Sequence, residues 1–83
     1  MSKTIYTITY VSKFDDIYTD TDVVTTLEQV NENISTLIED INENEIDKQL
    51  DSDYIYNGGS AELHAADTWN GREWIIKIKE HKL

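Results

Sequence analysis

The chain has no cysteine and no proline, and its 83 residues include only three glycines. Without cysteine, neither a disulfide nor a Cys-based metal site can support the fold, which suits a reducing compartment such as the cytoplasm. Long apolar runs are also missing: no stretch approaches the roughly 18 residues of a membrane-spanning helix, and no secretory signal is recognisable. These absences predict a cytoplasmic protein that makes no use of a membrane.

Positive charge is equally scarce, with seven basic residues against seventeen acidic ones and a net charge of −10. Residues 14–67 hold fifteen of the acids and a single base, Lys48. Such a block repels nucleic acid and anionic lipid and favours a basic protein as partner. Because 39% of the residues are hydrophobic, we expect residues 1–83 to fold as one domain around a modest core.

Residues 22–43 carry the clearest periodicity in the chain. Apolar side chains recur at helical spacing and form one stripe: Val23, Leu27, Val30, Ile34, Leu37, Ile38 and Ile41. This spacing predicts an amphipathic helix over 22–43, with Asp22 as its N-cap. The stripe must then face a core.

The opposite side of this helix is acidic. Glu28, Glu32, Glu39 and Glu43 fall within roughly 60° of one another on a helical wheel and form a row about 22 Å long. Glu39, Asp40, Glu43 and Glu45 crowd the negative end of the helix dipole, where acids are unfavourable. The arrangement indicates a binding surface, although acids on a solvated helix face also keep a small protein soluble.

The first third of the chain predicts a strand and an acidic loop. Residues 4–12 are β-branched and aromatic and alternate, with Tyr6, Ile8 and Tyr10 on one face. Residues 14–21 are expected to form a loop that carries three acids: Asp15, Asp16 and Asp20. Three aspartates raise the question of calcium, but the EF-hand spacing with its central glycine is missing, so no metal is expected.

After residue 43 the helical period breaks. The sequence predicts a bend at 42–45, a short helical turn over 46–50, a brief strand at 54–56 and a turn at Asn57-Gly58-Gly59. The glycines have no following lysine, so they indicate a turn rather than a phosphate-binding loop.

The last third predicts a hairpin around Asn70-Gly71, a pair that favours a two-residue type I′ turn. Pairing outward from this turn sets Ala65 opposite Ile76, Leu63 opposite Ile78 and Glu62 opposite Lys79. One face is then apolar, and the other carries His64, Lys77 and other polar groups. The expected fold class is α+β: two layers, with one amphipathic helix packed on a mainly antiparallel sheet of three to four strands, in the order β-α-(α)-(β)-β-β.

Residues that could perform catalysis are few. There is no cysteine, and the two histidines, His64 and His81, belong to no recognisable nucleophile or metal motif. His64 and Asp67 are three apart on a strand, so they point to opposite faces. We therefore expect a non-enzymatic protein that needs no cofactor.

A binding module fits better, because a rigid row of carboxylates can occupy the basic groove with which a nucleic-acid-binding protein meets DNA. Trp69, beside the tight turn, is the aromatic side chain most expected to be exposed. The expected partner-binding residues are Asp15, Asp16, Asp20, Glu28, Glu32, Glu39, Asp40, Glu43 and Trp69.

In size, acidity, lack of cysteine and richness in Asn, Asp, Glu, Ile and Tyr, the chain resembles inhibitors encoded by bacteriophages and mobile elements. These include anti-CRISPR and anti-restriction proteins and inhibitors of uracil-DNA glycosylase. The resemblance implies a DNA-mimicking protein that disables a basic nucleic-acid-binding protein of the host without catalysis.

Two other functions stay open. One is an antitoxin or immunity protein whose acids cover the active site of a nuclease. The other is a small structural, virion-type protein that associates with itself, for instance as a homodimer through an exposed sheet edge.

Overall fold

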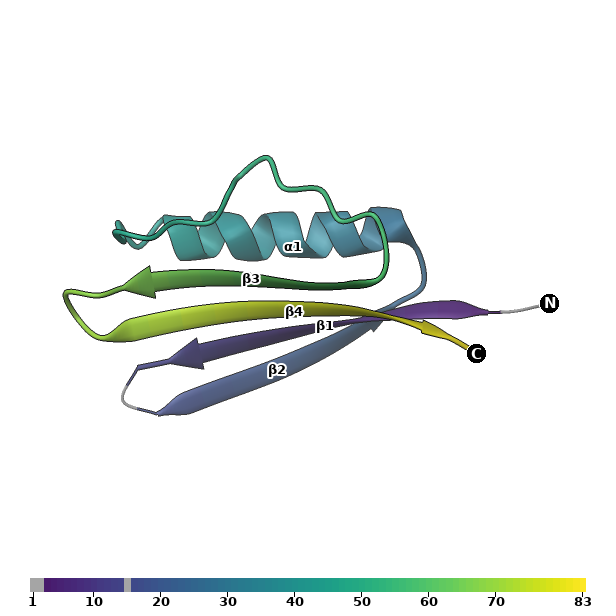
Figure 1. Ribbon diagram of the computed structural model, residues 1–83, viewed down its shortest axis with the longest axis horizontal. Helices are drawn as coiled ribbons and strands as arrows, with labels where there is room; N and C mark the ends of the chain where they lie inside the picture. Colours follow the sequence, from purple (N-terminus) through teal and green to yellow (C-terminus); the bar gives the residue numbers. More distant parts are fainter. Residues whose placement is uncertain (1–2, 15) are drawn as a thin grey trace.

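The computed structural model describes residues 3–14 and 16–83 and has five regular elements. They are the strands β1 (Thr4–Lys13) and β2 (Ile17–Val24), the helix α1 (Leu27–Asn42), and the strands β3 (Ser60–Asp67) and β4 (Arg72–Lys82). The strands form one antiparallel sheet in the order β2-β1-β4-β3, with α1 as a second layer (Figure 1). The expected two-layer α+β fold is confirmed.

The first strand occupies the centre of the sheet. It pairs with β2 on one side and with β4 on the other, where Ile8 lies opposite Ile78 and Tyr10 opposite Ile76. Its predicted alternation is confirmed, since Tyr6 and Ile8 are buried while Thr7 and Thr9 point to the other face. Both ends of the chain therefore contribute central strands.

The helix is shorter than predicted and begins at Leu27 rather than after Asp22. Thr26 is the N-cap, because its hydroxyl accepts a hydrogen bond from the Gln29 amide at 3.1 Å. The Gln29 side chain in turn accepts one from the Thr25 amide at 3.0 Å, a variant of the capping box. The predicted N-cap at Asp22 was wrong, and so was the inclusion of Val23 in the apolar stripe.

Residues 17–24, predicted as loop and helix start, form the strand β2. Their content of threonine and β-branched residues favours an extended chain, and pairing with β1 satisfies one side of its backbone. The second strand therefore precedes the helix instead of following it. Val23 lies on the face away from the helix and is 60% exposed.

The core lies between α1 and the inner face of the sheet. It combines the helix stripe with side chains from β1, β3 and β4, and with three from the segment 43–59, which we call the return segment. The buried apolar residues are Tyr6, Ile8, Val30, Ile34, Ile38, Ile41, Ile46, Leu50, Tyr56, Ala65, Trp74, Ile76 and Ile78.

Two asparagines of α1 attach the return segment to the helix. The Asn31 amide accepts a hydrogen bond from the Tyr56 amide at 2.8 Å and donates one to the Tyr56 carbonyl at 3.1 Å. Asn42 makes the same pair of bonds to Leu50, both at 2.9 Å. These bonds satisfy backbone groups that a helix or strand would otherwise pair.

The return segment consequently needs no regular structure. The predicted bend at 42–45 and turn at Gly58-Gly59 are confirmed, and Glu45 has a φ of +51°. The predicted helical turn over 46–50 and strand at 54–56 were wrong. Residues 46–50 are irregular, with one bridge from Lys48 to Ala66 on β3.

The C-terminal hairpin forms, but with a four-residue loop. Asp67 lies opposite Arg72, Ala65 opposite Trp74, and Leu63 opposite Ile76, a shift of two residues from the predicted register. Only Gly71 has a positive φ in this loop, whereas a type I′ turn requires it at two successive residues. Because the shift is even, every side chain keeps its predicted face.

Truncation of Ile76, which is fully buried, should therefore test the core directly. We expect Ile76→Ala to lower the free energy of unfolding by about 2–5 kcal/mol, because it leaves a cavity between α1 and the sheet. Its neighbour Ile75 points to the open face and is the matched control, with an expected loss of roughly 1 kcal/mol or less. Urea unfolding followed by circular dichroism measures both, and equal losses would contradict this placement of the core.

Candidate partner-binding surface

The acids of α1 form a solvated row on its outer side. Glu28, Glu32, Glu39 and Glu43 are all exposed, while the buried residues Val30, Ile34, Ile38 and Ile41 lie on the other side of the helix. None of the three ion pairs found among residues 3–14 and 16–83 involves an acid of this row. The predicted row thus exists as an uncompensated negative surface.

The negative surface extends from the row toward β2. Asp40 is exposed and lies two helical turns beyond Asn33, on the same flank of α1. The Asn33 amide donates a hydrogen bond to the Asp22 carboxylate at 3.2 Å, which joins this flank to β2. Asp20 is exposed on the same face of β2 as Asp22.

Asp16 is also exposed, beside the turn between β1 and β2, while Asp15 lies outside the described residues. This turn, the C-terminal end of α1 and the loop between β3 and β4 all lie at one end of the molecule (Figure 1). The structure therefore gathers Asp16, Asp40, Glu43 and the Trp69 loop at the same end.

A hollow of about 440 Å³ lies beside the row. It is lined by Ser35, Ile38, Glu39, Asn42 and Glu43 from the helix and by Ser52 from the return segment. Two carboxylates and two hydroxyl groups surround an apolar floor, which matches the charged head and the aliphatic stem of a lysine or arginine side chain. The sequence could not indicate this hollow, because it depends on where the return segment lies.

Among the residues that the structure describes, Trp69 is the most exposed large hydrophobic residue, at 87%, and its predicted exposure is confirmed. The ends of its loop are fixed. Thr68 donates hydrogen bonds to the Asp47 carboxylate from its amide at 2.9 Å and from its hydroxyl at 2.6 Å. On the other side, the Asn70 side chain donates to Asp67 at 2.8 Å. Trp69 is therefore presented to solvent by an ordered loop.

Asp67 is the one buried charged residue among those described, with 4% exposure. The hydrogen bond from Asn70, followed by those from Arg72, lowers its pKa below the ordinary value. The Arg72 guanidinium binds Asp67 at 2.8 Å and lies over the ring of Trp74 at 5.1 Å and that of Phe14 at 5.8 Å. This arginine joins the two hairpin tips, a role that the sequence did not reveal.

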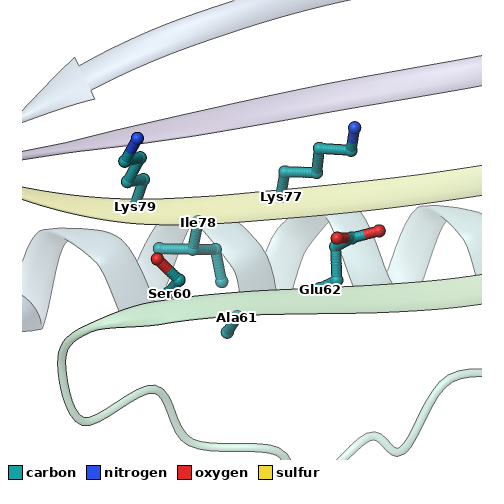
Figure 2. A pocket seen from close by; sticks show the side chains of 6 residues that line it. All are labelled: Ser60, Ala61, Glu62, Lys77, Ile78 and Lys79. Carbon is teal, nitrogen blue, oxygen red and sulfur yellow. The ribbon is translucent and has the colours of Figure 1, made fainter.

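The outer face of the sheet differs in charge. Figure 2 shows Lys77 and Lys79 of β4 beside Ser60 and Glu62 of β3, with the helix behind the sheet. These side chains surround a second, shallow hollow of about 430 Å³. His64 pairs with Glu62 on the same face at 2.9 Å and not with Asp67, which is on the opposite face as predicted.

Among the described residues, no group of three or more His, Asp or Glu side chains is placed to hold a metal ion. The one helix, α1, does not meet the length and hydropathy that crossing a membrane requires. In comparisons with family models, curated proteins and solved structures, nothing matches this chain. The class established for the protein is therefore that of its fold, a small two-layer α+β domain.

The acids at the C-terminal end of α1 should cost stability. They face the negative end of the helix dipole, and the last turn has no basic residue. We expect Glu39→Lys/Glu43→Lys to raise the free energy of unfolding by about 0.5–1 kcal/mol at low salt.

The control for this effect is Glu28→Lys, in the first turn of the same helix, which should lower stability by about 0.3–1 kcal/mol. Urea unfolding at low and high salt measures both variants. Loss of stability in the double variant would show that these acids support the fold instead of weakening it.

The lowered pKa of Asp67 makes part of the stability depend on pH. Because its pKa is lower in the folded than in the unfolded chain, its contribution is present above about pH 4 and is lost as the pH falls through the folded pKa. At about pH 6 the free energy of unfolding of wild type should therefore be higher than that of Asp67→Asn. At about pH 2.5 the difference between the two free energies should be smaller. A gap that is independent of pH in urea unfolding would show that the Asp67 charge is not involved.

Proposed function

We propose that this protein is a non-enzymatic inhibitor that binds a basic nucleic-acid-binding protein of a host cell, in the manner of anti-CRISPR or anti-restriction proteins. The observation that carries the proposal is the uncompensated row of carboxylates on the outer side of α1, continued by Asp40, Asp20 and Asp16. The row lies on one side of α1, and the opposite side of the same helix is packed in the core. Because this packing fixes the helix, the carboxylates are held in a fixed arrangement.

The spacing of the charges supports DNA mimicry. Duplex DNA presents regularly spaced negative charge, and proteins that bind it meet that charge with lysine and arginine. Along the row, Glu28 and Glu32 are about 6 Å apart, as are Glu39 and Glu43, and the interval between these two pairs is about 10.5 Å. The hollow between Glu39, Glu43 and Ser52 adds a place where one basic side chain of the partner can lose its water without losing hydrogen bonds.

The cost of these acids to the stability of the fold also supports a binding role. Three acids at the C-terminal end of α1, Glu39, Asp40 and Glu43, without a basic residue in the last turn, are unfavourable for folding. Residues that weaken the fold without an evident compensating contact are expected at functional surfaces. Trp69 supplies what charge alone lacks, because a rigid exposed aromatic side chain provides apolar contact and affinity at the centre of an interface.

The proposal predicts which variants lose the partner. Tagged protein retrieves its partner from nuclease-treated bacterial lysate, and wild type is compared with Glu32→Lys/Glu39→Lys and with Trp69→Ala. Wild type should retain a nucleic-acid-binding protein that high salt releases, and both variants should lose at least about tenfold in affinity.

The matched control is Glu62→Lys/Glu73→Lys, which changes the net charge equally but on the outer face of the sheet. This control should retain the partner. If it loses the partner as well, net charge rather than the acidic row governs binding. If the helix variant binds as tightly as wild type, the row is only a solvated surface and the proposal fails.

A further inference from the structure

The two edges of the sheet are protected to different degrees. At the β3 edge, the Lys48 amide donates to the Ala66 carbonyl at 3.0 Å and the Ala66 amide donates to the Lys48 carbonyl at 3.1 Å. The β2 edge pairs with β1 alone, and no other described strand lies beside it. Seven of its eight residues are exposed. The outer backbone groups of β2 are thus open to a further strand.

β2 lacks most of the usual devices that block an edge strand, and the one that it carries is a pair of charged side chains on its helix-side face, Asp20 and Asp22. It contains no lysine and no proline, and its pairing with β1 runs without a bulge from Ile17 to Val24. At eight residues it is also longer than the short strands that often close a sheet. Only two charged side chains, Asp20 and Asp22, interrupt its β-branched and aromatic composition.

These two aspartates determine which strand fits. Side chains alternate along β2, so Tyr18, Asp20 and Asp22 share the helix-side face, whereas Ile17, Thr19, Thr21 and Val23 share the outer face. If two copies joined through antiparallel β2 strands that overlap over nearly their full length, with both helices on one side of the sheet, Asp20 would lie opposite Asp20 or Asp22 of the other copy. Like charges directly opposite are destabilising, and each copy carries a charge of −10.

We propose that β2 is a docking edge for an extended segment of a basic partner protein, which pairs with it as a fifth strand. The segment carries lysine or arginine at alternate positions, opposite Asp20 and Asp22, and threonine or β-branched residues in between, opposite Thr19 and Thr21. Backbone hydrogen bonds supply the affinity, and the alternating charges select the partner and its register. This docking edge shares Asp20 with the negative surface described above, but it does not depend on the row of carboxylates on α1.

The proposal can be tested with a defined peptide and without the natural partner. The probe is an eight-residue peptide, Thr-Lys-Val-Lys-Thr-Lys-Val-Lys, added to the ¹⁵N-labelled protein. A peptide of the same composition with its four lysines together serves as the control. In an antiparallel pair every second amide of β2 points to the new strand. We therefore expect amide shifts and slowed hydrogen exchange at alternate residues of 17–24, with α1 unaffected.

Matched variants separate the docking edge from the acidic row. Asp20→Asn/Asp22→Asn should weaken binding of the alternating peptide by roughly two- to fivefold per aspartate. Glu39→Gln/Glu43→Gln, which removes the same charge from α1, should leave it unchanged. If α1 is the site of the shifts, or both peptides bind equally, attraction is only electrostatic and the proposal is overturned. If the β2 amides are protected from hydrogen exchange without peptide, and this protection increases with protein concentration, the edge pairs with a second copy of the chain. That result would also overturn the proposal.

Discussion

The fold depends on the contact between one side of α1 and one face of the sheet. Val30, Ile34, Ile38 and Ile41 of the helix meet Ile8, Ile76 and Ile78 of the central strands, and these residues are almost fully buried. A single helix is narrow for a sheet of four strands, so the return segment adds Ile46, Leu50 and Tyr56 to the same core. Asn31 and Asn42 hold that segment in place through its backbone. The opposite side of α1 is consequently free of any packing role.

This division lets the chain carry an unfavourable charge distribution. Fifteen of its seventeen acids lie between residues 14 and 67, and the structure arranges many of them on the outer side of the helix and the flank of β2. Because every member of the row is exposed, the repulsion among these carboxylates is screened by water and salt. A surface of this kind can be strongly negative while the domain remains folded.

The sequence predicted the parts of the fold that depend on strong local patterns. The alternation of Tyr6, Ile8 and Tyr10 and the stripe from Val30 to Ile41 located the central strand and the helix, and the acidic row followed from the helical period. The predicted start of the helix was wrong because the spacing of Val23 fits the apolar stripe of a helix. In the structure Val23 belongs to the edge strand β2 instead. The hairpin register shifted by two residues because side chains of Asp67, Asn70 and Asp47 stabilise a wider loop, an effect that turn preferences do not include. The hollow beside Glu39 depends on long-range packing and has no local signal.

The central claim is that the acidic row and the Trp69 loop occupy the surface with which a host protein binds nucleic acid. Competition tests this claim most directly. A fluorescent duplex DNA is bound to the partner retrieved from the lysate, the unlabelled acidic protein is added, and the anisotropy of the duplex is followed. We predict that the acidic protein displaces the duplex, and that Glu32→Lys/Glu39→Lys displaces it far less. A ternary complex, in which the duplex and the acidic protein are bound to the partner at the same time, would contradict this claim.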